Sequence, residues 1–421
     1  MIDVEKWREI LSTLGRHKLR TALTAFGVFW GIFMLTVLLG AGKGLENGVN
    51  LGFPRVTNTV YIWSQGPTQI PYQGMPIGRQ IRLRPEDVGA IARNVQSVGF
   101  VTGQNSVGVW DGGNAPYVVH GSKSGGFSIQ GGFARIEDFN SLRILQGRSI
   151  NGLDEPERRK VALIGKKVRE QLFAPDEDPV GQDITINGIT FQVIGVFVSM
   201  QNGNQQQEEQ RIYIPNTTLR NSFNQADRIG SFVIVPKPGV RSEQAERETK
   251  AYLAQINKVS PDDRGVFGSF NLQNEHDKVQ GLFTGIKFFS WMVAVGTIFA
   301  GAVGVGNIML IVVKERTREI GLRKALGATP ASIVSMIIQE SVFITAVAGY
   351  SGLVMGALLI QGIASALQAS GGRAGFFGQP EVEFTTAMIA LGVLLFSGLL
   401  ASLMPAAKAA AVNPIVALQD E

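Results

Sequence analysis

Long apolar stretches and polar stretches follow one another along the chain. Residues 21–41, 288–313 and 384–404 contain no charged side chain, and residues 333–367 contain only Glu340. A helix rises about 1.5 Å per residue, so about 20 apolar residues cross a bilayer core of about 30 Å. The pattern therefore predicts transmembrane helices over 21–42, 288–313, 333–367 and 384–404.

Basic residues predict how these helices are oriented. Arg16, Lys18 and Arg20 precede the first apolar run, basic residues crowd 314–324 after the second, and Lys408 follows the fourth. Lys and Arg favour the cytoplasmic side. We expect cytoplasmic termini, a cytoplasmic segment 314–332 and a cytoplasmic tail 405–421. The short loop 368–383 should lie outside. The first apolar run is longer than the core of a signal peptide, so we interpret it as a span.

Residues 43–287 are polar enough to form an aqueous domain. Alternating segments predict strands at 56–62, 99–109, 116–120, 160–164, 183–186, 190–198, 211–214 and 231–235. Helical periodicity appears at 84–93, 165–172 and 242–256. Asn187-Gly188 predicts a tight hairpin, and Pro85 suits the first turn of a helix. The sequence thus predicts an α-helical membrane protein with a large α+β periplasmic domain between its first two transmembrane helices.

This aqueous domain is expected to hold two α+β subdomains. The break is expected near 236–240 or within the glycine-rich stretch 121–132, and the polar stretch 201–210 is expected to be a mobile loop. Before the first span, residues 1–20 predict an amphipathic helix in the headgroup plane. Its apolar face carries Val4, Trp7, Ile10, Leu11 and Leu14.

The charged segment 314–332 predicts a short helix. Glu319 and Arg323 are four residues apart and can pair along it. Gly327 suits its end, and Thr329-Pro330 suits the start of the next helix. An apolar side formed by Ile320, Leu322, Ala325 and Leu326 is expected to seat in a groove of a partner.

Glu340 and several small residues stand out within the spans. An acid in a span is a functional candidate, but Glu340 lies near the cytoplasmic end, so we favour an ion pair with Arg323 or Lys324. Small residues four apart let helices approach closely. Gly27 and Gly31 form one such pair, and two further ridges are expected to be packing faces: Gly296, Ala300 and Gly304, and Ala348, Gly352 and Gly356.

Composition narrows the possible chemistry. The chain has 421 residues, is 45% hydrophobic and carries a net charge of +5, with its basic residues beside apolar runs. That placement fits membrane topology and not nucleic-acid binding. Cysteine is absent, which excludes disulfides, and three isolated histidines (His17, His120 and His276) suggest no metal centre. Residues 40–44 read GAGKG, which is not a phosphate-binding loop. We expect no catalytic, cofactor-binding or metal-binding residues.

Several motifs resemble the MacB/FtsX-like superfamily of ABC-transporter permeases, also called type VII or mechanotransmission ABC proteins. They are LRTALT at 19–24, KERTREIGLRKALGA at 314–328, PAAKAA at 405–410 and NPIVAL at 413–418. In the aqueous domain, GR at 147–148, VALIG at 161–165, PVG at 179–181 and IYIP at 212–215 are similar to the family's periplasmic core. MacB proteins carry a nucleotide-binding domain on the same chain, and these 421 residues differ from them there.

The resemblance implies a non-catalytic inner-membrane permease driven by a separate ATPase that binds ATP and Mg. It implies a second permease copy, in a homodimer or heterodimer, and export from the periplasm with an adaptor and an outer-membrane channel. The alternatives are a Lol-type permease that releases lipoproteins and an FtsX-like regulator of cell-wall hydrolases; the size of the aqueous domain favours MacB or Lol. The residues implied in ATPase coupling are Glu315, Arg316, Arg318, Glu319, Ile320, Leu322, Arg323, Lys324 and Leu326.

Overall fold

The computed structural model describes residues 18–108, 114–201, 205–369, 378, 380 and 384–414. The chain divides into a membrane-helix unit, Met1–Gly48 with Leu282–Glu421, and an aqueous unit, Val49–Gly281. Residues 1–17 of the predicted interfacial helix, most of the loop 368–383 and the tail beyond 414 lie outside the described residues.

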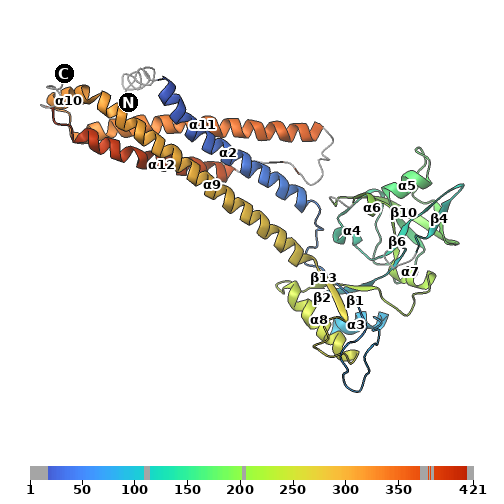
Figure 1. The fold of residues 1–421 in the computed structure, drawn as a ribbon. Helices are drawn as coiled ribbons and strands as arrows, with labels where there is room; N and C mark the ends of the chain where they lie inside the picture. The colour runs from blue at the N-terminus through green and yellow to red at the C-terminus, as the bar shows by residue number, and fades with distance from the viewer. Residues whose placement is uncertain are drawn as a thin grey trace. The chain divides into compact units, whose positions relative to one another are not determined.

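Long helices dominate the membrane-helix unit (Figure 1). They are α2 (Lys18–Asn50), α9 (Leu272–Glu315), α11 (Pro330–Ala369) and α12 (Phe384–Ala410). Each contains a segment that is long and apolar enough to cross a membrane, as the sequence predicted. The helices are longer than the apolar runs, because a helix continues through polar residues where the bilayer ends. Thus α2 continues to Asn50, and α9 begins at Leu272, directly after a strand.

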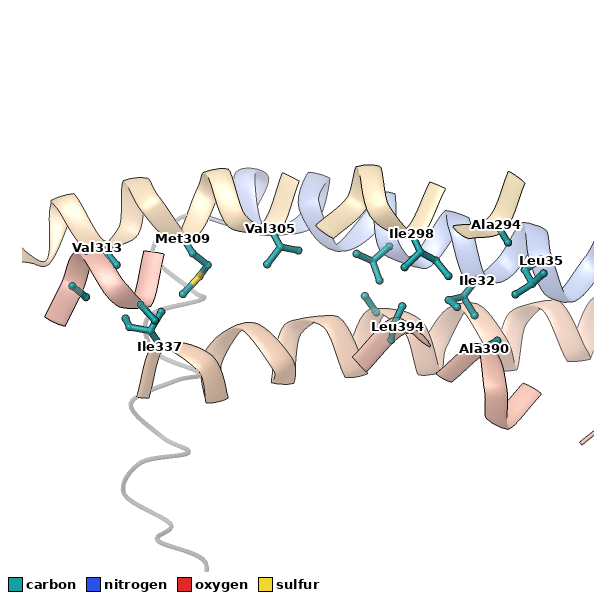
Figure 2. Close-up of a cluster of buried hydrophobic side chains, with 14 of the residues drawn as sticks. Ile32, Leu35, Ala294, Ile298, Val305, Met309, Val313, Ile337, Ala390 and Leu394 are labelled. Carbon is teal, nitrogen blue, oxygen red and sulfur yellow. The ribbon is translucent and has the colours of Figure 1, made fainter. Parts of the chain in front are cut away.

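An apolar cluster joins these helices along their length. Figure 2 shows Ile32 and Leu35 of α2, Ile298 and Val305 of α9, and Leu394 of α12 directed toward one another. Just before the apolar run of α9, Lys287 forms an ion pair with Glu46 of α2 at 2.9 Å, which adds a polar contact between the two helices.

Glycines set the closest approaches between helices. A Cβ at Gly352 would lie 2.5 Å from the Phe29 carbonyl oxygen of α2, and one at Gly356 would lie 2.7 Å from Thr36 Cβ. This ridge of α11 is therefore a packing face, as predicted. The α9 ridge differs, because a Cβ at Gly296 or Gly304 would meet nothing within 4 Å in the described residues.

Proline 405 lies inside α12, although the sequence placed it in the tail. Proline has no backbone N–H, so the Ala401 carbonyl four residues earlier lacks its helical partner. A Cβ at Gly306 of α9 would lie 2.9 Å from that carbonyl oxygen. The helix therefore continues past Pro405 to Ala410, with the glycine backbone of α9 packed against the carbonyl that the proline leaves without a partner.

One sheet of the aqueous unit has four antiparallel strands in the order β13-β1-β12-β2. Their bounds are β1 (Val60–Ser64), β2 (Val98–Gln104), β12 (Ser231–Pro236) and β13 (Phe267–Asn271). Helices α3 (Pro85–Asn94) and α8 (Ser242–Ile256) belong to this part, and its buried cluster includes Ile62, Ile91, Phe232 and Leu253. The Leu272 amide at the start of α9 donates to the Thr59 carbonyl at 3.0 Å, so this helix starts on the sheet.

The other sheet has nine strands and mixed pairing, with β8–β10 and β6–β11 parallel. Its helices are α4 (Ile136–Phe139), α5 (Lys166–Leu172), α6 (Gln205–Glu209) and α7 (Asn216–Ser222). The Asn187-Gly188 hairpin is confirmed between β9 and β10. The strands are β3 (Ser106–Val107), β4 (Tyr117–His120), β5 (Lys123–Gly126), β6 (Ser128–Gly132), β7 (Leu142–Gly147), β8 (Val161–Gly165), β9 (Asp183–Ile186), β10 (Ile189–Ser199) and β11 (Arg211–Pro215).

The chain changes sheets at places that the sequence did not predict. It leaves the four-stranded sheet after β2 and returns at β12. Neither predicted break is therefore a change of sheet: 121–132 lies within the nine-stranded sheet, and 236–240 follows β12 of the four-stranded sheet. Buried amides mark the crossing: Asn105 Nδ2 donates to Gln225 Oε1 at 2.8 Å, and the Asn105 amide donates to Asn216 Oδ1 at 2.9 Å. Side-chain amides can satisfy backbone groups where strand pairing stops. Their partners are far apart in the sequence, so no local pattern predicts these hydrogen bonds.

The stretch 201–210 contains α6, so the expectation of a mobile loop is wrong for residues 205–209. Glu208 is buried, pairs with Arg211 at 2.7 Å and accepts a hydrogen bond from the Tyr213 hydroxyl. Burial raises the pKa of Glu208, although Arg211 and Tyr213 oppose the shift. Burial and the nearby Glu208 charge raise the pKa of Tyr61 to about 12. These buried partners keep the polar sequence of α6 in place.

The tight ridge of α11 leads to a test of membrane-helix packing. Replacing Gly352→Ala should destabilise the protein by about 1–3 kcal/mol, because the new methyl group would overlap the backbone of α2. Gly392→Ala in α12 is the matched control, since a Cβ there meets nothing within 4 Å. Thermal unfolding in detergent measures both variants. Equal midpoints for the two would show that α2 and α11 do not pack as described.

Candidate functional site

The charged segment forms a separate short helix, α10 (Thr317–Ala325). Arg316 links it to α9 with φ −98° and ψ 13°, outside the helical region. Gly327 ends it with φ +98°, a conformation that favours glycine, and the Ala328 amide donates to the Arg323 carbonyl at 3.0 Å. Pro330 then begins α11. The start and stop signals read from the sequence are confirmed here.

One face of α10 is directed into the helix unit. Ile320 is 1% exposed and belongs to the same apolar cluster as Val313 of α9, Ile333 of α11 and Ala409 of α12. The expectation that Ile320 seats in a groove of a partner is therefore wrong. Its side chain already has a place in the core, where removing its apolar surface from water is favourable.

Arg316 holds the start of this segment against α11. Its guanidinium lies 3.4 Å from Glu340 and 3.1 Å from Glu319. Glu340 is 3% exposed, so a charged partner is needed to keep the carboxylate there. The predicted ion pair of Glu340 exists, but with Arg316 instead of Arg323 or Lys324. Arg323 lies further along α10 and pairs with Glu319 at 2.9 Å, as its spacing predicted.

Lys324 reaches a different helix. Its Nζ donates to the carbonyl oxygens of Ala410 and Val412, both at 2.7 Å. The last carbonyls of a helix have no partner within the helix, and basic side chains near a helix C-terminus bond to them favourably. Ala410 is the last residue of α12. Sequence reasoning missed this contact, because the two partners are more than eighty residues apart.

The other face of α10 is exposed. Leu322 is 51% exposed and Leu326 is 80% exposed. Exposed large apolar residues beside charges are typical of protein contact sites. Together with Ala325 and Arg318, which are also exposed, these residues form what we call the outer face of α10. Glu315, the last residue of α9, is also exposed.

Within the described residues, no three His, Asp or Glu side chains are grouped as a metal site would require. His120 is held by the Asp183 carbonyl at 2.7 Å and by Glu177 at 2.9 Å, which links the end of β4 to the start of β9 and to the loop after α5. His276 lies near Asp277 and edge-on to Phe53. These contacts account for both histidines structurally.

Comparison with known families identifies the chain. Residues 21–252 match the MacB-like periplasmic core domain, and residues 291–414 match the FtsX-like permease C-terminal domain. The second match includes α10, α11 and α12 in full. The chain therefore belongs to the MacB/FtsX-like family of ABC-transporter permeases.

Curated relatives agree over nearly the whole chain. The pyoverdine export ATP-binding/permease protein PvdT of Pseudomonas syringae pv. syringae is 28% identical over 412 residues, covering 96% of this chain and 58% of PvdT. The macrolide export ATP-binding/permease protein MacB of Bdellovibrio bacteriovorus is 24% identical, covering 99% of this chain and 62% of MacB. This chain thus spans about 60% of the length of these relatives.

A solved structure is also similar to part of the chain. The periplasmic region of MacB from Actinobacillus actinomycetemcomitans is 23% identical to this chain. The match covers 56% of this chain and 98% of that structure, with a TM-score of 0.42.

The ion pair between Arg316 and Glu340 provides a stability test. Arg316→Met should destabilise the protein by about 3 kcal/mol, because it leaves a buried carboxylate without its partner. Replacing both residues by methionine should recover most of that loss. Thermal unfolding of the single and double variants in detergent measures the interaction. Additive losses in the double variant would show that the pair does not interact.

Proposed function

We propose that this chain is the permease subunit of an ABC exporter and that an ATPase docks on the outer face of α10. The observation that carries the proposal is the division of α10 into two faces. Ile320, Arg316 and Lys324 tie its inner face to the other helices. Leu322 and Leu326 project from its outer face. A partner that pushes on this helix therefore pushes on a part that is attached to α11 and α12.

ATP and Mg would bind to the ATPase and not to these 421 residues. The sequence contains no G-x-x-x-x-G-K-[S/T] loop to hold the phosphates. The names of the relatives PvdT and MacB join an ATP-binding part to a permease part. We propose that another polypeptide supplies the ATP-binding part here.

Movement of α10 would then act on the aqueous unit through α9. This helix is continuous from Leu272 to Glu315, so a displacement at its cytoplasmic end is passed along its axis. Its other end begins directly after β13, next to β1. This route supports a mechanotransmission role, in which ATP hydrolysis drives movements of the periplasmic domain.

Export from the periplasm, with an adaptor and an outer-membrane channel, fits this mechanism best. PvdT is named for pyoverdine export and MacB for macrolide export. Co-purification of an adaptor would support export. A bound lipoprotein would instead indicate a Lol-type permease, and a bound cell-wall hydrolase would indicate an FtsX-like regulator.

We further propose a second permease copy against α9. Phe289, Met292 and Phe299 are exposed on this helix, and a Cβ at Gly296 or Gly304 would meet nothing within 4 Å in the described residues. A second copy or membrane lipid would cover this face, and small residues favour a helix. The dimer is a homodimer if the second permease chain has this sequence and a heterodimer if it is a related chain.

The proposed orientation places the termini and α10 in the cytoplasm and the aqueous unit outside the inner membrane. The chain contains no cysteine, so single cysteines report without background. In intact cells, a membrane-impermeant maleimide that enters the periplasm should label Ile77→Cys but not Leu326→Cys, both at exposed positions. Lysed cells serve as the control, where both should react. Labelling of both positions in intact cells would contradict the topology.

Docking on the outer face of α10 can be tested by association with the ATPase. Leu322→Asn combined with Leu326→Asn should weaken binding at least tenfold, because buried apolar anchors dominate protein interfaces. Pull-down of the ATPase that co-purifies with the wild-type permease measures this. Ile77→Asn in the aqueous unit is the matched control, since it also removes an exposed apolar side chain. Equal binding by both variants would exclude this docking face.

A further inference from the structure

Lys324 joins α10 to a particular part of α12. The two carbonyls that it binds, those of Ala410 and Val412, both lie beyond Pro405. Ammonium-to-carbonyl hydrogen bonds are charge-assisted, and the negative end of the α12 dipole adds to their strength. The contact is thus made to the post-proline segment, residues 406–412, and not to the long apolar part of α12.

Pro405 weakens the connection between this segment and the rest of α12. It cannot donate to the Ala401 carbonyl, so one helical hydrogen bond is missing at that turn. Such positions are where long helices bend. The Ala401 carbonyl lies against Gly306 of α9, where any larger residue would place its Cβ only 2.9 Å from the oxygen.

The post-proline segment is well packed on its inner side. Ala406 is 1% exposed and Ala409 is fully buried, in the cluster that contains Ile320 of α10. The segment therefore belongs to the same apolar cluster as Ile320 of α10, in addition to its polar contact with Lys324. Its covalent link to α12 passes through the turn with the missing hydrogen bond.

We propose that Lys324 is a positioning residue that couples α10 to the post-proline segment, with the turn at Pro405 as the hinge. Displacement of α10 then carries residues 406–412 with it, while the part of α12 before Pro405 stays in the bundle. The inference deepens the proposed function and rests on it for the source of the displacement. It assigns α12, in addition to α9, a part in transmission.

Pairs of spin labels can test the connection in the permease alone. Cysteines at Leu322 and Ala407 report across the hinge, and cysteines at Leu322 and Leu399 report on the part of α12 before Pro405; these positions are exposed. In Lys324→Met, the distance distribution for 322–407 should broaden at least twofold, and that for 322–399 should not change. Lys324→Arg should restore the narrow distribution, because it keeps a cationic donor.

Lys408→Met is the matched control, since it removes an exposed cation from the last turn of α12, the helix whose end Lys324 contacts. It should leave the 322–407 distribution narrow. If Lys324→Met does not fold, Lys324→Gln is measured in the same way. The proposal is overturned if Lys324→Met (or Lys324→Gln, where that variant is used) gives the wild-type distribution, or if Lys408→Met broadens the distribution equally.

The coupling itself is read with the co-purifying ATPase. A pair of labels that avoids the docking face, at Leu399 and Ala407 on either side of Pro405, is used here. Addition of ATP and vanadate should change the 399–407 distance in the wild type, and Lys324→Met should lose this change, normalised to the amount of bound ATPase. If no ATPase binds to the wild-type permease, the proposed function is contradicted, but the role of Lys324 is not. Persistence of the change in Lys324→Met would contradict the role of Lys324 alone.

Discussion

The burial of Ile320 is the contact on which the candidate site depends. A short helix with five basic and acidic side chains between Arg316 and Lys324 would otherwise have little reason to stay against a bundle of apolar helices. Burying one large aliphatic side chain contributes about 1.5–3 kcal/mol. It also sets the rotation of α10, and this rotation decides which side chains face α11 and α12 and which face outward.

Polar contacts then complete what Ile320 begins. Arg316 neutralises Glu340 in a place where an unpaired carboxylate would be costly, and Lys324 satisfies carbonyls at the end of α12. Each contact gives a hydrogen-bonding or charged partner to a group, a buried carboxylate or a terminal helix carbonyl, that would otherwise lack it. The charges of this segment therefore have two distinct roles, some holding the helix in place and others remaining on its exposed side.

Helix packing in the membrane-helix unit likewise depends on close apolar contact and on the placement of backbone carbonyls. Gly352 and Gly356 bring α11 against the backbone of α2, where dispersion contacts replace the hydrophobic effect that lipid cannot supply. Gly306 has no side chain, so the Ala401 carbonyl, which Pro405 leaves without a helical donor, can lie against the backbone of α9. The α9 glycines at 296 and 304 look the same in sequence, yet they contact no other described helix. Spacing identifies a ridge, and only the neighbouring helix shows whether the ridge is used.

Local patterns alone determined the four apolar spans, the hairpin at Asn187-Gly188, the helix boundaries at Gly327 and Pro330, and the pairing of Glu319 with Arg323. Each depends on residues close together in the chain, through helix length, turn conformation or side-chain spacing. Tertiary structure alone decided the partner of Glu340, the burial of Ile320, the bond from Lys324 to α12 and the interleaving of the two sheets. These depend on which helix faces or strands meet across tens or hundreds of residues. Periodicity shows that a face is apolar or charged, but the choice of its partner is a property of the packed whole.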